Sequence, residues 1–354
     1  MTFSPIKTIS TKLATLELHE MLTYMRPHGT PTEERFVNKF VDTLPKVWAD
    51  GYGNRHVVIG DINVLWSCHT DSVHHEHGRQ VVLKRDGHFG LKPHQPQRPS
   101  CLGADCATGV WIMRHMVLRG IPGHYVFHRD EECGGLGSSW VAKNDPDLLN
   151  GLEIAIAFDR KGYSSVITHQ GSRTASDEFA RSIAGLLGGK YEPDATGIFT
   201  DTAKYASIIP ECSNLSVGYH DAHSSQETQD FEFASELLDK MCDLDTTKLV
   251  VSRDPKVIEY RDYRSTYYSG SSFRWTDHYD DQWDDWGFDA PASDNKAYSD
   301  TPRSTELARL SGSTNYARLK RLIEDNPDEV ADWLDNEGID AEDLADVIYA
   351  RYNR

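Results

Sequence analysis

The stretch HYVFHRDEECGG, residues 124–135, joins a short apolar run to three consecutive acidic residues and a pair of glycines. Residues 124–128 form a short, apolar and partly β-branched run, which predicts a buried strand. Asp130, Glu131 and Glu132 follow where that strand would end, although like charges so close together disfavour one another's ionised forms. A strand end that leads into a Gly-rich loop tolerates them when a counter-charge is near, and a metal ion is the strongest one available.

Strand and helix patterns alternate through the first 250 residues. Besides 124–128, segments 64–67, 152–158 and 212–219 have the pattern of strands. Helical patterns cover 12–25, the stretch from a capping box at Thr30 to about Leu44, 107–118, 176–189 and 231–245. This alternation predicts a three-layer α/β/α sandwich around a mixed, mostly parallel sheet.

Composition divides the chain into three parts. Residues 1–252 carry the strand and helix patterns and are interpreted as a catalytic domain. Residues 253–302 are acidic, rich in aromatic residues and without period, so we expect a disordered linker. Residues 303–354 predict a small helical module, which could bind a protein partner.

Charge and cysteine content narrow the classes of protein to consider. With 37 Lys and Arg against 55 Asp and Glu, the net charge is −18, which argues against nucleic acid or an anionic membrane as the main partner. No apolar run is long enough to span a bilayer, and residues 1–10 lack the apolar stretch of a signal peptide. Six cysteines without the spacing of a disulfide framework indicate reduced thiols, so we expect a cytoplasmic protein.

Acidic and histidine residues repeatedly follow the predicted strands. They are His69 and Asp71, Asp105, Glu131 and Glu132, Asp159, and the pair His220 and His223. In an α/β sheet the carboxyl ends of the strands gather at one site, so these side chains should converge. Asp71 lies two residues after His69, on the same side of a strand, and can accept the free imidazole N–H.

Taken in order, five motifs resemble those of the co-catalytic zinc exopeptidases: His69-Thr70-Asp71, Gly103-x-Asp105, Glu131-Glu132, Asp159 and His223-Ser224-x-x-Glu227. This group contains aminopeptidases, carboxypeptidases, tripeptidase-like enzymes and related deacylases of one α/β fold, and the resemblance covers residues 10–245. The gaps of 36 residues from His69 to Asp105 and of 64 from Asp159 to His223 hold no lid or dimerisation domain. The compact aminopeptidase-like type is therefore the one expected.

The resemblance implies a role for each residue. Asp105 would bridge two metal ions, with His69 and Asp159 completing one site and Glu132 and His223 the other. Glu131 would be the general base, and Asp71 would support catalysis by orienting His69. The implied cofactor is two Zn²⁺ per chain, although Mn²⁺ or Co²⁺ can occupy such sites.

Several alternatives stay open at this stage. His220 competes with His223 as the last ligand. Asp201 could contact a substrate amine or cap a helix, and Arg160 could meet a substrate carboxylate or a carboxylate nearby. Cys68, Cys106 and Cys133 adjoin presumed ligands and are expected to be packing residues rather than zinc ligands. The cluster His74-His75-Glu76-His77 is expected to be a polar loop near the substrate pocket rather than a metal site.

The expected function is thus a metal-dependent hydrolase of small peptides, an aminopeptidase with a dinuclear zinc site. A carboxypeptidase or an N-acyl amino-acid deacylase on the same fold is the nearest alternative. Two others are a non-catalytic binding protein that works through its tail and a cyclising transferase with a single zinc. The sequence is compatible with a monomer or an oligomer.

Overall fold

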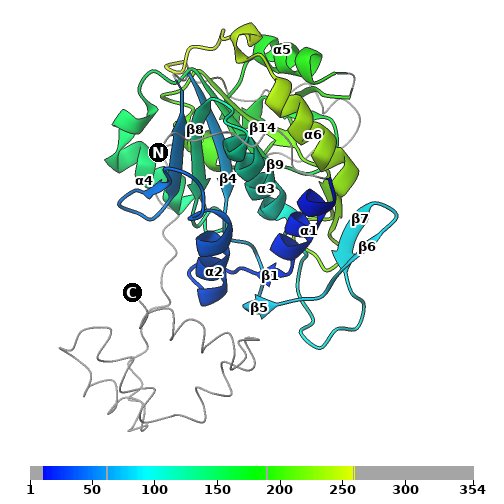
Figure 1. The fold of residues 1–354 in the computed structure, drawn as a ribbon. Coiled ribbons are helices and arrows are strands. Elements are labelled where there is room, and N and C mark those ends of the chain that lie inside the picture. Colours follow the sequence, from blue (N-terminus) through cyan, green and yellow to red (C-terminus); the bar gives the residue numbers. More distant parts are fainter. Residues whose placement is uncertain (1–10, 61–62, 189, 258, 260–354) are drawn as a thin grey trace, which may run out of the picture. The chain divides into compact units, whose positions relative to one another are not determined.

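The computed structural model describes residues 11–60, 63–188, 190–257 and 259. An eight-stranded sheet runs through this part of the chain (Figure 1). Its order is β13 (Glu192–Asp194), β10 (Ser165–Ile167), β14 (Glu211–Ser216), β9 (Ile154–Arg160), β4 (Val64–His69), β8 (Gly123–His128), β3 (Arg55–Ile59) and β2 (Trp48–Ala49). The central strands β14, β9, β4 and β8 are parallel to one another, and β3 and β10 join them antiparallel. At the two ends of the sheet, β2 pairs antiparallel with β3 and β13 pairs parallel with β10. The mixed, mostly parallel sheet expected from the sequence is confirmed.

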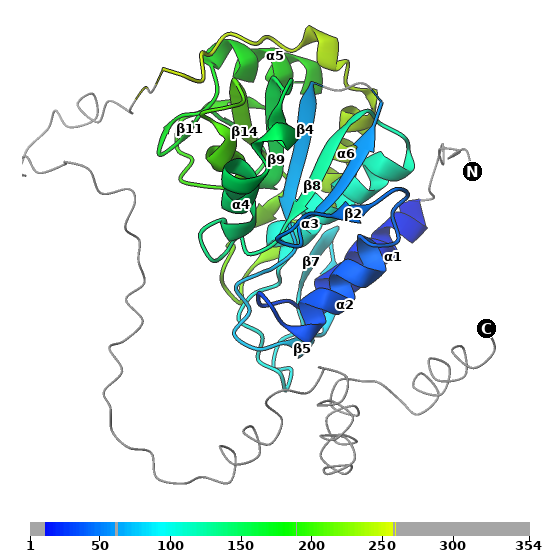
Figure 2. The same ribbon diagram turned by 90° about the vertical axis from the view of Figure 1, so that its left-hand side faces the viewer.

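Helices cover both faces of this sheet (Figure 2). The larger buried cluster takes in α1 (Thr11–Leu22), α2 (Pro31–Phe40), α3 (Ala104–Leu118), α5 (Asp177–Leu187) and α6 (Phe231–Asp243). A smaller cluster on the opposite face contains α4 (Leu136–Asn144) and the 3₁₀ turns η1 (Pro146–Leu149) and η2 (Asp201–Tyr205). The predicted three-layer sandwich is therefore confirmed as well.

The central strands read as continuous apolar runs because both of their faces are buried. Every residue of β4 and β8 is buried. Successive side chains of a strand point to opposite faces, so Trp66 joins the larger cluster and Leu65 the smaller one. Such strands place their carboxyl ends in a fixed register, in which His69 at the end of β4 pairs with His128 at the end of β8.

A second, smaller sheet was not foreseen from the sequence. Its order is β15 (Tyr219–His220), β16 (Thr228–Asp230), β7 (His88–Leu91) and β6 (Val82–Arg85), all antiparallel. Shorter pairs join β1 (Tyr24–Met25) to β5 (Gly78–Arg79) and β11 (His169–Gln170) to β12 (Ser172–Arg173). The pairing of β7 with β16 brings the chain that leads to Asp105 beside the chain that follows His223.

Two helices end earlier than the sequence patterns predict. The first stops at Leu22 and continues as strand β1, rather than running to residue 25. The second begins at Pro31, with Thr30 as its N-cap as predicted, but ends at Phe40 rather than near Leu44. The N–H groups of Val41 and Asp42 both donate to Val37 O, which closes that helix.

The predicted module at residues 303–354 lies outside the described residues, as does most of the predicted linker at 253–302. The first residue of the linker, Arg253, packs against the sandwich. Its guanidinium donates to the carbonyls of Pro210, Ala206 and Ile209 at 2.5–2.9 Å. All six cysteines are free thiols. Among the residues that the structure describes, no helix is both long and apolar enough to cross a bilayer.

Candidate metal centre

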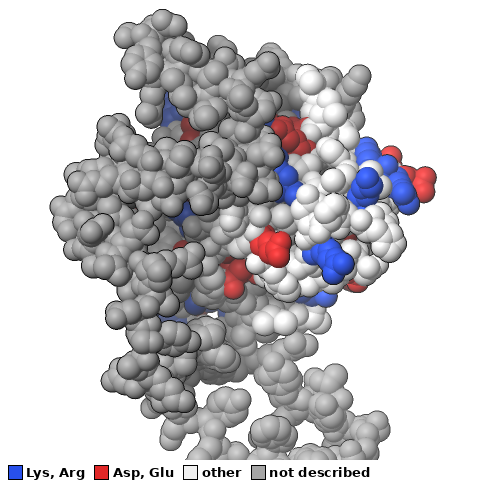
Figure 3. Space-filling view, turned by 90° about the horizontal axis from the view of Figure 1, so that it is seen from below, with Lys and Arg blue, Asp and Glu red and all other residues white. Residues whose placement is uncertain are grey.

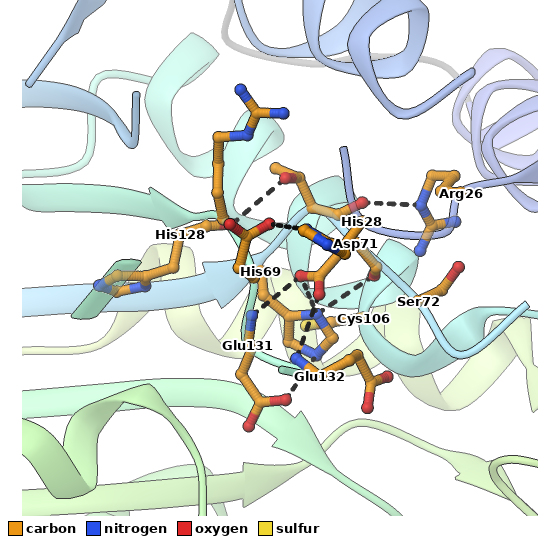
Figure 4. A network of polar contacts seen from close by, with 12 residues as sticks. Arg26, His28, His69, Asp71, Ser72, Cys106, His128, Glu131 and Glu132 are labelled. Atoms are coloured by element: carbon orange, nitrogen blue, oxygen red, sulfur yellow. Dashed lines mark hydrogen bonds and ion pairs between the residues drawn. The ribbon is translucent and has the colours of Figure 1, made fainter. Parts of the chain in front are cut away.

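The side chains at the carboxyl ends of β4, β8 and β9 meet at one end of the main sheet. Figure 4 shows those that follow β4 and β8. His69 is the last residue of β4, and Asp159 is the last but one residue of β9. Glu131 and Glu132 follow β8. Asp105, at the start of α3, completes the group. The structure thus brings together residues that lie up to 154 positions apart, from His69 to His223.

Asp105 lies between two sets of potential ligands. Its Oδ1 is 3.0 Å from His69 Nε2, which also lies 3.4 Å from Asp159 Oδ1. Its Oδ2 is 3.2 Å from His223 Nε2, which in turn lies 3.5 Å from Glu132 Oε2. One carboxylate oxygen faces each set, which is the arrangement that a bridging ligand requires.

The position of Asp105 is set by hydrogen bonds to the backbone around it. Gly103, at the N-cap of α3, has a φ of 75°, a conformation that glycine adopts without strain. The buried carboxylate of Glu227 accepts the backbone N–H groups of Leu102, Gly103 and Asp105 at 2.8, 2.8 and 3.1 Å. Glu227 therefore ties the segment after His223 to the loop that carries Asp105. In the sequence it stood out only as part of the last motif.

Asp71 connects the first motif to the third. Its two carboxylate oxygens accept the backbone N–H groups of Glu131 and Glu132, each at 3.1 Å. Its Oδ1 also lies 3.4 Å from His69 Nδ1, the contact expected from their spacing. A single buried carboxylate thus orients both an imidazole and the backbone of two acidic residues (Figure 4).

Arg26 could not be selected from the sequence. Its fully buried guanidinium donates from Nε to Thr70 O at 3.0 Å and from Nη2 to Gly103 O at 3.1 Å, and it lies over the ring of Phe36. It therefore links the loop after β4 to the loop before Asp105. An isolated arginine between Met25 and Pro27 carries no sequence signal for that role.

Asp159 is held by two further residues that sequence reasoning missed. Thr200 donates its hydroxyl to Asp159 Oδ2 at 2.6 Å. The amide of Asn214 accepts the Asp159 N–H at 2.9 Å and donates to its carbonyl at 3.0 Å. Both come from segments next to β9 in space but about 40–55 residues away in sequence, so no local pattern could reveal them.

The structure also separates the two histidines that compete as the last ligand. His223 lies beside Asp105 and has a φ of 63°, in the left-handed region that non-glycine residues rarely adopt. Such backbone strain is concentrated at functional sites. His220 instead packs against the ring of Tyr163, with ring centroids 4.6 Å apart, and it is absent from the potential metal-ligand groups of the described chain.

The two residues expected near the substrate differ in their surroundings. Asp201 is fully buried, with Oδ2 3.3 Å from His128 Nδ1, and Thr200 rather than Asp201 is the N-cap of η2. Burial raises the pKa of Asp201 to about 8. Arg160 donates to Thr196 at 2.8 Å and to Asp194 at 3.5 Å, so it meets a carboxylate nearby.

The neighbouring cysteines and histidines are mostly structural. Cys68 and Cys106 are buried in the larger cluster. The thiol of Cys106 donates to Phe158 O at 3.2 Å, and its Sγ also lies near potential ligand atoms of His69 and Asp159. Cys133 is exposed, so the expectation that it packs in the core is wrong.

His74 is likewise buried, in a polar loop. Its ring nitrogens contact Ser72 at 2.7 Å and Gln80 at 3.2 Å, and burial lowers the pKa of His74 to about 3.

The charges of the site are out of balance without a cation. Burial raises the pKa of Glu131 well above its usual range and also raises that of Glu132. Burial and the nearby Asp105 raise the pKa of Asp159 to about 7. Glu132 Oε1 and Asp159 Oδ1 are buried and accept no hydrogen bond from the described part of the chain.

The carboxylates beside His223 favour its protonated form. Hydrogen bonds to Asp105 and Glu132 raise the pKa of His223 to about 11. Metal ions bind deprotonated imidazoles and carboxylates and displace such protons. The unpartnered oxygens, the crowded carboxylates and the N/O donor set therefore fit zinc or a similar divalent ion.

No protein-family model and no curated protein matches the sequence. The fold, in contrast, is similar to solved structures. For the aminopeptidase PepT from Bacillus cereus the TM-score is 0.51 at 14% identity, over 66% of this chain and 98% of that one. For a tripeptidase from Staphylococcus aureus it is also 0.51 at 14% identity, over 66% and 97%. The α/β fold implied by the resemblance to the zinc exopeptidases is thereby confirmed.

Proposed function

We propose that this protein is a metal-dependent hydrolase that cleaves the peptide bonds of small peptides, as an aminopeptidase. The observation that carries the proposal is the position of Asp105, with His69 and Asp159 at one of its oxygens and His223 and Glu132 at the other. The fold shared with an aminopeptidase and a tripeptidase supports the same reading.

Two divalent ions, held by these five side chains, would supply Lewis acidity toward the scissile carbonyl and lower the pKa of the attacking water. Three of these ligands are held in position by hydrogen bonds: Asp71 holds the backbone of Glu132, Glu227 that of Asp105, and Thr200 the carboxylate of Asp159. Such outer contacts orient ligands and raise metal affinity. Zinc is proposed as the resident ion, with manganese or cobalt as substitutes.

Glu131 is proposed as the general base. Its Oε2 lies 4.0 Å from Nε2 of the proposed metal ligand His69, and Glu131 is buried. Burial favours the protonated carboxyl, so a proton taken from water can be held at Glu131 and passed to the leaving amine. Asp71 holds the Glu131 backbone in place for this transfer.

Asp201 and Arg160 are proposed to contact the substrate. Asp201 Oδ2 lies 3.3 Å from His128 Nδ1, and the buried carboxyl would accept a further hydrogen bond from a substrate ammonium group. Arg160 donates from Nη2 to Asp194 and Thr196, and the other N–H groups of its guanidinium would meet a substrate carboxylate.

A panel of N-blocked and C-blocked dipeptides tests the specificity. An aminopeptidase should cleave peptides with a free amine and spare the N-blocked ones. Cleavage that instead requires a free C-terminal carboxylate would favour a carboxypeptidase, and cleavage of N-acyl amino acids would favour a deacylase. No hydrolysis of any member by the metal-loaded protein would contradict the proposal.

Glu131→Gln tests the role of the base, since the amide keeps the shape but cannot take up a proton. We expect kcat to fall by about a hundredfold or more, with the metal content unchanged. Glu192→Gln makes the same change at an exposed glutamate of β13 and should behave as the wild type. Unchanged hydrolysis in Glu131→Gln would refute the assignment.

The remaining expectations stay predictions: a cytoplasmic location, the oligomeric state and a partner for residues 303–354.

A further inference from the structure

A cavity of about 770 Å³ lies between the loop that follows β7 and the segment that follows His223. Residues 91–96, 98 and 99 line one side, and Ser225 and Gln226 line the other. The volume falls in the range of about 300–1,000 Å³ that is usual for small-molecule sites. No sequence motif pointed to it.

The residues that line the cavity are close in sequence to two residues of the candidate metal centre. Ser225 and Gln226 come two and three residues after His223, so the chain places them within about 10 Å of it at full extension. The loop on the other side leads into Leu102 and Gly103, whose N–H groups Glu227 holds. The cavity is thus bounded by the two segments that carry Asp105 and His223.

Hydrogen bonds and prolines restrain the loop from 92 to 99. The side chain of Gln95 accepts the Val81 N–H at 2.7 Å and donates to the carbonyls of Val81 and Lys92 at 3.1 and 3.2 Å. Three prolines, Pro93, Pro96 and Pro99, restrict the backbone further. His94 and Arg98 are held at φ values of 58° and 44°, a strained region that is concentrated at ligand-binding loops.

The lining of the cavity is basic. Lys92, His94 and Arg98 line it, whereas none of the lining residues is acidic, in a chain of net charge −18. Neither Lys92 nor Arg98 forms an ion pair with any residue that the structure describes. Figure 3 shows the molecule from below, where Lys and Arg side chains stand together with Asp and Glu among mostly uncharged residues.

We propose that this cavity binds a carboxylate of the peptide substrate through Lys92 and Arg98. The inference rests on the proposed peptidase function and adds a substrate class to it: short peptides that carry a carboxylate a few residues from the scissile bond. That carboxylate can be the C-terminus or an Asp or Glu side chain. Guanidinium and ammonium groups favour such anions by charge-assisted hydrogen bonds.

The test compares binding and turnover of matched peptides. Three tetrapeptides share one free N-terminal residue: one with a free C-terminus, its C-terminal amide, and an amide that carries Asp at the third position. The Asn form of the third peptide serves as its neutral counterpart. Dissociation constants are measured by calorimetry on Glu131→Gln, which should bind without cleaving, and kcat/KM on the wild type.

We expect the carboxylate peptides to bind about tenfold more tightly than their neutral counterparts, and Lys92→Gln/Arg98→Gln to abolish that preference. Lys190→Gln, a charge change at an exposed lysine outside the cavity, should leave the preference intact. A preference for the free C-terminus or for the Asp peptide identifies the source of the carboxylate. Equal binding of acid and neutral peptides by Glu131→Gln would overturn this inference, while cleavage of both by the wild type would leave the peptidase proposal standing. If the neutral peptides are not cleaved either, the peptidase proposal fails, and the calorimetric preference still decides whether the cavity binds carboxylates.

Discussion

At the scale of single residues, each acidic residue of the candidate centre forms a hydrogen bond, through its side chain or its backbone, with another polar side chain. Glu227 holds the backbone around Asp105, Asp71 holds the backbone of Glu131 and Glu132, and Thr200 donates to Asp159. A carboxylate that points at a metal ion must keep its position while the substrate changes shape. These supporting contacts supply that rigidity.

Asp71→Asn tests the importance of one such contact. The amide retains one acceptor oxygen but turns an N–H group toward the backbone N–H of Glu131 or Glu132, so one of the two hydrogen bonds is lost. We expect metal affinity or kcat to fall by about 10–100-fold. The measurement is a metal titration followed by kcat for a cleaved dipeptide.

Asp86→Asn is the matched control for that experiment. Asp86 is exposed and has a φ of 49°, which asparagine adopts readily. It should leave both quantities unchanged. Wild-type values in Asp71→Asn would mean that the contacts of Asp71 do not matter to the site.

The sequence reveals the site residues to very different degrees. The candidate ligands could be selected because His, Asp and Glu directly after apolar runs form a pattern along the chain. Arg26, Thr200 and Asn214 could not, since each acts on a residue at least 40 positions away and has an ordinary sequence neighbourhood. Asp201 was selected, but the sequence could not show that Thr200 occupies the N-cap position beside it.

At the scale of elements, helix α3 carries Asp105 and packs closely on β4 and β9. Gly109 lies at this contact. A Cβ atom there would come within 2.5 Å of both Phe158 O and Cys106 Sγ and 3.0 Å of Cys68 Cβ. The absence of a side chain at position 109 therefore sets how closely α3, and with it Asp105, approaches the sheet.

Gly109→Ala should push α3 away from β9. We expect a loss of about 1–3 kcal/mol in the free energy of unfolding, together with weaker metal binding because Asp105 moves. Gly185→Ala is the control: it lies within α5, with nothing within 4 Å of the added Cβ, and should be neutral or slightly stabilising. Denaturant unfolding and metal titration of both variants provide the comparison, and equal stabilities would contradict the packing argument.

The turn between β2 and β3 provides a prediction on pH. Asp50 Oδ1 accepts the backbone N–H groups of Tyr52, Gly53 and Asn54 at 2.8–3.0 Å, and Oδ2 lies 3.2 Å from His56 Nε2. Burial opposes ionisation of the carboxyl, but the hydrogen bonds from His56 and Asn54 prevail and lower the pKa of Asp50 to about 2. The ionised side chain therefore stabilises the folded state above its unfolded pKa of about 4.

Asp50→Asn should lose about 1–3 kcal/mol of unfolding free energy at neutral pH. Because the pKa is lower in the folded state, the stabilisation is lost as the pH falls through the range from about 4 to 2. The difference between wild type and variant should therefore shrink over that range. Urea unfolding at pH 7, 4 and 3 measures it, and a difference that stays constant would show that the charge of Asp50 contributes nothing.

The strands differ in how far the sequence could predict them. The main strands were located because they are buried on both faces and read as apolar runs. Strands β6, β7, β15 and β16 are two to four residues long. The pairs β6–β7 and β15–β16 are local, but β7 and β16 join them into one sheet by a pairing between segments more than 120 residues apart, as in Thr228 with Gly90. No local pattern announces that long-range pairing, so the joined sheet and the cavity beside it could be found only in the structure.

At the scale of the whole molecule, two sheets and the N-terminal segment meet around one group of acidic side chains. The main sheet contributes His69, Glu131, Glu132 and Asp159, and the small sheet brings the His223 segment next to the loop of Asp105. In a chain with a net charge of −18, such a concentration of buried carboxylates is costly unless a cation accompanies it. The account therefore depends on the presence of metal ions.

The metal content per chain is the most direct test of this central claim. It is measured by elemental analysis on protein purified without chelator or histidine tag, for the wild type and for Asp105→Ala. The account predicts about two zinc, manganese or cobalt ions per wild-type chain and a clear loss in Asp105→Ala. A wild-type protein that binds none, even after incubation with excess metal, would contradict it.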